Sequence, residues 1–235
     1  MLIVFSNQKG GVGKSTLAVL FSDFLGMRNI RCRVLDCDPQ ATILNIYAND
    51  LTKEGIPHDF HGMLTGKVKV PFNKSSYFRI ERTPFDLLSS LIRRYIQSGE
   101  TFFHDDEYDV TVIDLPGSLQ KEEMEPIFKL ADVIITPSSF TKVDNDSTVA
   151  FAAILDAMNV RAKKFIIPNS IPVGAILPQR EEAGTTLLNL GYTITPDIVR
   201  TINLARGISS MYISFNAQLA VESAFTFILK KINLV

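Results

Sequence analysis

Short apolar runs alternate with longer stretches of helical periodicity along the whole chain. The runs, rich in β-branched residues and bounded by polar or turn residues, are Leu2–Phe5, Cys32–Leu35, Asp109–Ile113, Val133–Ile135 and Phe165–Ile167. Continuous runs of this length are typical of strands that are covered on both faces. Between them, apolar residues recur at helical spacing, as at Leu17, Leu20, Phe21, Phe24 and Leu25. The pattern predicts an α/β fold with a mostly parallel twisted sheet and helices on both faces.

The segment from about Asn49 to Thr83 departs from this rhythm. It is rich in Gly and Pro, carries scattered Lys and Asn, and shows little periodicity. We expect an irregular excursion with short helical turns, followed by a strand at Phe85–Leu88. No internal repeat and no Ser/Gly-rich linker interrupts the sequence, so the simplest expectation is a single domain over residues 1–235.

The charge of the chain is nearly balanced, with 24 Lys and Arg against 25 Asp and Glu. A net charge of −1 argues against a dedicated nucleic-acid binder unless the charge is unevenly distributed. Residues 160–235 carry eight basic and four acidic residues, so this third has a charge of +4 and the remainder −5. The balance therefore permits a basic patch in the C-terminal third.

The cysteine usage and the apolar runs bear on the compartment. Cys32 and Cys37 are spaced as C-x4-C, which fits neither a disulfide framework nor a paired zinc pattern. The apolar start is too short for a signal peptide, and no stretch approaches the roughly 18 apolar residues of a membrane span. These features predict a soluble protein of the reducing cytoplasm.

The segment between the first run and the first helical pattern reads N-Q-K-G-G-V-G-K-S-T from residue 7 to residue 16. The strict G-x-x-x-x-G-K-[ST] pattern is absent, because Gln8 stands where its first glycine would be. A backbone containing Gly10, Gly11, Val12 and Gly13 can still curl with its N–H groups around phosphate oxygens at a helix N-terminus. In such a loop Lys14 neutralises the β- and γ-phosphates, Ser15 is a ligand of Mg²⁺, and Thr16 contacts the α-phosphate.

The run from Lys9 to Thr16 resembles the deviant Walker A box of the ParA/MinD superfamily of P-loop ATPases, whose hallmark is a second lysine, here Lys9. The resemblance implies that Lys9 reaches across a nucleotide-sandwich dimer to the phosphates of the partner's ATP, as an arginine finger does. It also implies that Gly10 lies where the two subunits approach closely.

Two later segments resemble the switch elements of that superfamily. Residues 36–40, Asp-Cys-Asp-Pro-Gln, resemble switch I, which implies that Asp38 positions the attacking water near the Mg²⁺ shell while Asp36 supports the loop. Residues 114–117, Asp-Leu-Pro-Gly, resemble Walker B and switch II. There Asp114 would hold Mg²⁺ through a water molecule, and Gly117 would lend its amide to the γ-phosphate.

The evidence for base and DNA contacts is looser. The family places an adenine-contacting group at the end of the predicted strand Phe165–Ile167, where Asn169 lies, although a turn-forming Asn beside prolines fits equally well. The resemblance also implies non-specific DNA binding by basic residues of the C-terminal third, which ATP-dependent pairing would double. Solvated helix faces explain each candidate equally well, and the candidates are Arg200, Arg206, Lys230 and Lys231.

The end of the chain repeats apolar residues at helical spacing, at Val221, Phe225, Ile228 and Leu229. Such a stripe is more often a core face than the membrane-targeting helix of MinD-type relatives, which needs supporting charge. The sequence begins directly at the first strand, so we expect no N-terminal DNA-binding extension of the kind that larger partition proteins carry.

The resemblance as a whole implies a small ParA-type partition ATPase with ATP and Mg²⁺ as cofactors and weak intrinsic activity. It would form a homodimer on ATP, associate with the nucleoid, and respond to a ParB-like or small DNA-binding adaptor protein. The cargo stays open among plasmid, chromosome and other assemblies. The main alternative is a MinD-like regulator that cycles on a membrane. An iron–sulfur carrier would need cysteines at the dimer face, and a small-molecule ligase or kinase would not need Lys9.

Overall fold

The computed structural model describes residues 1–235 except 74–75, 99–105, 118–119, 175–176, 202–207 and 212. Within the described residues, eight strands form a sheet in the order β3-β2-β4-β1-β5-β6-β7, with β8 paired to β6. Each of these pairings is parallel. The strands are β1 (Leu2–Phe5), β2 (Cys32–Asp36), β3 (Arg79–Arg82), β4 (Val110–Asp114), β5 (Val133–Ser138), β6 (Lys163–Ile171), β7 (Tyr192–Ile194) and β8 (Ile198–Val199).

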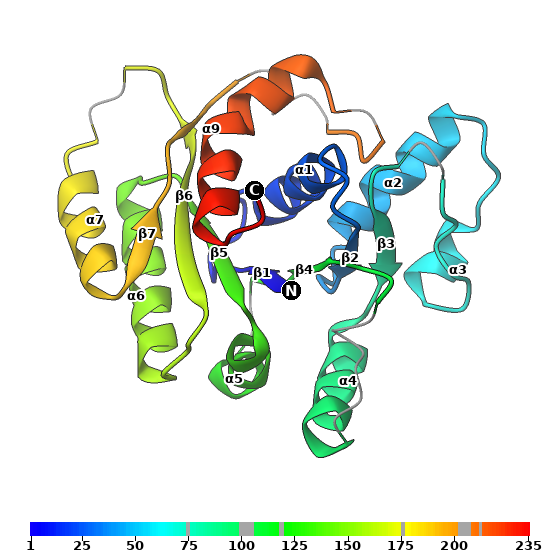
Figure 1. Cartoon of the computed structure of the whole chain (residues 1–235), viewed down its shortest axis with the longest axis horizontal. Helices are drawn as coiled ribbons and strands as arrows, with labels where there is room; N and C mark the ends of the chain where they lie inside the picture. The colour runs from blue at the N-terminus through cyan, green and yellow to red at the C-terminus, as the bar shows by residue number, and fades with distance from the viewer. Residues whose placement is uncertain (74–75, 99–105, 118–119, 175–176, 202–207, 212) are drawn as a thin grey trace.

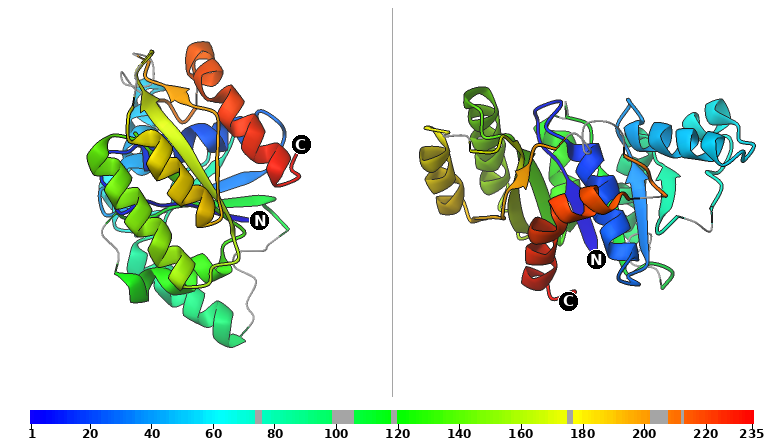
Figure 2. Two further views of the ribbon diagram at one scale, coloured as in Figure 1. Left: turned by 90° about the vertical axis from the view of Figure 1, so that its left-hand side faces the viewer. Right: turned by 90° about the horizontal axis from the view of Figure 1, so that it is seen from above.

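Helices cover both faces of the sheet (Figures 1 and 2). The described helices are α1 (Lys14–Gly26), α2 (Thr42–Lys53), α3 (Phe60–Leu64), α4 (Phe85–Ser98), α5 (Lys121–Leu130), α6 (Lys142–Ala157), α7 (Arg180–Asn189) and α9 (Phe215–Lys231). Strand β1 shows why two layers are needed: Ile3 and Phe5 lie in one apolar cluster with α1, α2 and α9, whereas Leu2 and Val4 lie in the other with α4 to α7. The predicted fold class and the five predicted strands are confirmed.

The prediction of a strand at Phe85–Leu88 is wrong, because these residues begin helix α4. Leu88 and Ile92 are its buried residues, four positions apart on one helical face, and a window of four residues was too short to reveal that spacing. The strand lies earlier, at Arg79–Arg82, inside the segment expected to be irregular. It escaped notice because an edge strand that buries only Ile80 has no apolar run. The expected short helical turn is present as α3.

The apolar face of α9 belongs to the core. Val221, Phe225, Ile228 and Leu229 are buried, and the ring of Phe225 lies 5.0 Å from that of Phe21 in α1. Figure 2 shows α9 lying beside α1. Of the helices that the structure describes, none has the length and apolar character to cross a bilayer.

The sheet order places the change of winding direction at β1. The chain leaves β1 through α1 to reach β2 on one side, and leaves β4 through α5 to reach β5 on the other side of β1. In open α/β sheets such a switch point opens a crevice outside the carboxyl ends of the strands. The glycine-rich segment 7–13 and the residues that end β2 and β4 lie at this edge.

Candidate functional site

The glycine-rich loop joins β1 directly to α1. Gly13 is the residue that caps α1, with φ of +94°, and a Cβ at this position would overlap the Asn169 amide. Only glycine combines that backbone conformation with so close an approach. Gly13 has no side chain that could cap the first amides of α1, so these N–H groups and the positive end of the helix suit an anion.

Lys14 lies in the first turn of α1, with its side chain turned back into the loop. Its Nζ donates to the backbone oxygen of Lys9 at 3.2 Å, and a Cβ at Gly117 would lie 3.1 Å from the same Nζ. Burial lowers the pKa of Lys14, while the carboxylates of Asp114 and Asp38 oppose this shift. The fold therefore brings Lys14, Gly117 and two predicted carboxylates to one place, and Ser15 and Thr16 follow Lys14 half-buried.

Lys9 pairs within its own chain. Its Nζ lies 3.4 Å from Asp144 Oδ1 in α6, and the Ser139 hydroxyl donates to the other oxygen of that carboxylate. A Cβ at Gly10 would lie more than 4 Å from the described residues around it, so the predicted role of Gly10 at a subunit interface stays a prediction. Lys9 is thus held by an acceptor of its own chain, and its predicted role in a partner's site stays a prediction.

Asp36 and Asp114 are neighbours at the carboxyl ends of β2 and β4, where they are register partners. Asp36 is well supplied with donors: Leu44 N donates to Oδ2 at 2.9 Å, and Arg82 Nη1 lies 3.4 Å from Oδ1. Burial raises the pKa of Asp36 to about 6, and the Leu44 amide and Arg82 oppose this rise. The expected supporting role of Asp36 thus has a concrete form, which is to hold the loop that contains Asp38.

Asp114 is fully buried, and neither of its carboxylate oxygens accepts a hydrogen bond from the described residues. Burial raises its pKa to about 7, although Ser15 and Lys14 nearby favour the charged form. An orphaned buried carboxylate beside a serine hydroxyl is a donor set that suits a hard divalent cation such as Mg²⁺. The residues present therefore fit the metal that the sequence predicts.

Asp38 lies at the tip of the loop between β2 and α2. Its Oδ1 accepts from Gln40 N at 2.8 Å, and its backbone oxygen accepts from Ala41 N at 2.8 Å. The side chain is partly exposed, near the glycine-rich segment 7–13 (hereafter the phosphate loop), and its negative charge raises the pKa of Lys14.

Asn169 lies within β6, rather than in a turn, and only 6% of it is exposed. Its Nδ2 donates to the backbone oxygen of Val12 at 2.9 Å. The side chain therefore braces the phosphate loop, and contact with a base stays a prediction.

The three basic candidates that the structure describes do not gather in one place. Arg200 is exposed, and its backbone N–H donates to Ile171 at the carboxyl end of β6. The backbone oxygen of Lys231 instead accepts from Lys163 at the amino end of β6. Because nine residues of strand span about 26 Å, Lys230 and Lys231 lie far from Arg200. Arg206 lies outside the described residues.

Three further residues shape the site and were not foreseen. Asn7 ties the loop to β5 by donating to Pro137 at 2.8 Å, while its Oδ1 accepts from Lys9 N. Asp144 pairs with Lys9, and Arg82 contacts Asp36. Asn7 is the first residue of the glycine-rich segment 7–13, and its polar character two residues after the apolar run was the available signal. The other two lie 135 and 46 residues from their partners, which no local pattern reveals.

Comparison with known structures supports the fold. The chain is similar to McdA of Cyanothece in complex with ATP, with a TM-score of 0.71 and 13% identity over 99% of this chain and 96% of that one. For a candidate plasmid partition protein of Borrelia burgdorferi bound to AMPPNP, the TM-score is 0.66 and the sequence identity 19%, over 98% of both chains. For MinD in the MinC:MinD complex of Aquifex aeolicus, the TM-score is 0.65 and the identity 17%, over 97% of this chain and 96% of that one. Identities this low show a shared fold alone.

Sequence comparison gives a partial match and a family. A candidate replication protein A of Rhizobium rhizogenes is 24% identical over 163 residues, which cover 57% of this chain and 39% of that protein. A relative from Sinorhizobium fredii is covered to the same extent, so the match spans about two fifths of these curated relatives. Residues 3–231 match the model of the CobQ/CobB/MinD/ParA nucleotide binding domain. Since that match takes in nearly the whole chain, the protein belongs to the CobQ/CobB/MinD/ParA nucleotide-binding family.

Proposed function

We propose that this chain is a ParA-type ATPase that forms a homodimer around ATP and binds DNA without sequence preference. A ParB-like or small DNA-binding adaptor would stimulate hydrolysis, and the cycle would segregate or position a plasmid, a chromosome or another cargo. The observation that carries the proposal is the convergence of Lys14, Asp38 and Asp114 on the phosphate loop. The plasmid partition protein and McdA among the structural neighbours support this choice within the family.

Each residue of the site has a proposed task. The loop amides and Lys14 bind the phosphates, Thr16 contacts the α-phosphate, and Gly117 offers its amide to the γ-phosphate. Ser15, Asp38 and Asp114 hold Mg²⁺, which when bound neutralises phosphate charge, and Asp38 also orients the attacking water. Asn169 supports the loop and reads the base.

Lys9 would act on the partner's nucleotide. Lys9 keeps 34% of its side chain exposed while it pairs with Asp144, so a strong anion can reach its ammonium group. The phosphates of a nucleotide held by a second subunit provide such an anion. Dimerisation on ATP and release of Lys9 would then be one event.

The position of Arg200 suits a nucleotide-dependent DNA contact. It lies at the edge of the sheet that carries the phosphate loop, and pairing two subunits across ATP would bring two such edges together. Lys230 and Lys231 lie at the opposite edge, so we propose that they add charge without joining that contact. The membrane-cycling alternative is less well supported, because the apolar face of α9 is packed on α1 and is not free to enter lipid.

The test is an electrophoretic shift on unrelated DNA fragments with Mg·ATP, with ADP and without nucleotide. Binding should appear with ATP alone and should weaken steeply with added salt, because phosphate contacts release counterions. Lys14→Ala should abolish the ATP effect. Sedimentation with anionic vesicles under the same three conditions tests the alternative. Equal DNA binding in all three states, or ATP-dependent vesicle binding without DNA binding, would rule out the partition proposal.

A further inference from the structure

Arg82 is a buried cation at the end of the edge strand β3. It is the register partner of Asp36, and its Nη1 donates to the backbone oxygen of Asp36 at 2.6 Å. The side chain is 7% exposed, and its Nε lies buried with no partner among the described residues. Among the described residues, the hydrogen bonds and the ion pair of this guanidinium are all made with Asp36.

Asp36 in turn closes the loop that carries Asp38. The loop leaves β2 at Cys37, whose N–H donates to Asp114 O, and it returns where Leu44 N donates to Asp36 Oδ2. Helix α2 begins after Ala41, which has φ of +46° and no capping side chain. The Asp36 carboxylate thus supplies the cap that the sequence before α2 lacks, and the same bond fixes the span of the loop.

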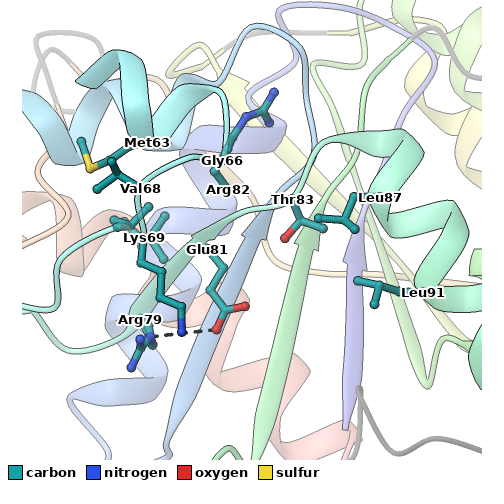
Figure 3. Close-up of a pocket in the computed structure, with 12 residues that line it drawn as sticks. Met63, Gly66, Val68, Lys69, Arg79, Glu81, Arg82, Thr83, Leu87 and Leu91 are labelled. Carbon is teal, nitrogen blue, oxygen red and sulfur yellow. Dashed lines mark ion pairs between the residues drawn. The ribbon is translucent and has the colours of Figure 1, made fainter. Parts of the chain in front are cut away.

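The outer side of β3 carries no further strand in the described structure, but flanks a cavity of about 320 Å³ whose lining includes Arg82 and Thr83 (Figure 3). Among the described residues, Arg82 is therefore held from the side of β2 and not by a strand on its outer side. Its hydrogen bonds to Asp36 orient it, and its positive charge lowers the free energy cost of burying the Asp36 carboxylate that caps α2.

We propose that Arg82 is a positioning residue for the nucleotide site: it holds Asp36, and through the Asp36–Leu44 bond it fixes the loop that places Asp38. The inference rests on the proposed ATPase function, because its consequence is a hydrolysis rate. Within the described structure the hydrogen bonds and the ion pair of Arg82 go to Asp36 and not to the phosphate loop or Asp38, so nucleotide binding should survive its loss. A water-orienting carboxylate displaced by about 1 Å costs about a hundredfold in rate.

The experiment compares Arg82→Met and Arg82→Lys with a matched control, Arg79→Met. Arg79 belongs to the same strand, but it lies at the other end and pairs with Glu81 and Glu107. Two readouts are needed: hydrogen exchange of the Leu44 amide in the nucleotide-free protein, and kcat and KM for Mg·ATP. Circular dichroism checks that each variant is folded. If Arg82→Met does not fold, the comparison is made with Arg82→Lys.

In Arg82→Met the Leu44 amide should exchange at least about tenfold faster, and kcat should fall about tenfold to a hundredfold with KM within about threefold. Arg82→Lys can still donate to Asp36 and should restore part of the Leu44 protection and part of kcat. Arg79→Met should change neither the Leu44 exchange nor kcat. Unchanged Leu44 exchange, an unchanged kcat, or the same losses in Arg79→Met would overturn the inference. If the parent protein hydrolyses no ATP, the proposed function fails, and the exchange arm still decides whether Arg82 fixes the loop.

Discussion

The charge on Asp114 should cost this protein stability whenever no cation is bound. The carboxylate is fully buried at the end of β4 without a hydrogen-bond donor among the described residues. The substitution Asp114→Asn removes the charge and nearly preserves the shape. We therefore expect the variant to be more stable than the parent at alkaline pH in the absence of Mg²⁺ and nucleotide.

The size and the sign follow from the pKa of Asp114, which burial raises from 3.8 to about 7. A shift of about three units corresponds to about 4 kcal/mol between the protonated and charged forms. Because the folded state holds its proton more tightly, stability falls as the pH rises from about 4 to about 7. About 3 kcal/mol of this loss falls between pH 5 and pH 8, and Asp114→Asn should lack that part.

The assay is urea unfolding at pH 5, 6, 7 and 8 in the presence of a chelator. Asp36, whose pKa is about 6, adds its own loss below pH 6 in both proteins, so the informative quantity is the difference between the two curves. Asp146→Asn, which removes an exposed carboxylate on α6, is the control and should run parallel to the parent. A variant that is less stable than the parent at pH 8, or that keeps the parent's pH slope, would refute the reasoning.

Three more substitutions test the surroundings of the phosphate loop. Lys9→Ala should bind fluorescent ATP within about twofold of the parent but lose turnover by about a hundredfold, whereas loss of binding would place Lys9 in its own subunit's site. Asp144→Asn releases Lys9, so sedimentation velocity with ATP should show dimers at about threefold lower protein concentration; no shift would mean that the ion pair does not oppose pairing. Asn169→Ala removes the bond to Val12 and should weaken ATP binding about fivefold by titration, and full affinity would exclude bracing.

The parts of the fold and site that the sequence predicts are those encoded locally. Five strands are continuous apolar runs, and the phosphate loop is one unbroken segment, so each could be recognised without knowing its neighbours. Asp114 was predictable because it ends an apolar run, and the ends of parallel strands face the crevice. The burial of the Asp114 carboxylate without a hydrogen bond from the described residues was not predictable, because it depends on how β2, β4 and α1 pack.

The parts that could not be predicted depend on contacts between distant residues. Strand β3 is held by its pairing with β2, and its polar sequence carries no strand signal. Helix α4 buries few residues, so the short apolar stretch at its start matches the pattern of a strand. The basic residues of the last third share a charge sign, but sequence does not reveal that β6 separates Arg200 from Lys231.

A row of residues crosses the sheet at the level of the site and explains why the adjacent Asp36 and Asp114 have different roles. Arg82, Asp36 and Asp114 occupy successive strands β3, β2 and β4 as register partners. The row contains two buried carboxylates but one cation, Arg82. This cation pairs with Asp36, which also accepts a hydrogen bond from the Leu44 amide. Asp114 is left with Lys14 as its positive neighbour, and that amine has its own pKa lowered by burial. Since the fold itself compensates Asp36 and leaves Asp114 short of positive charge, we expect a divalent cation to lower the free energy most at one place in this row, at Asp114 beside Ser15.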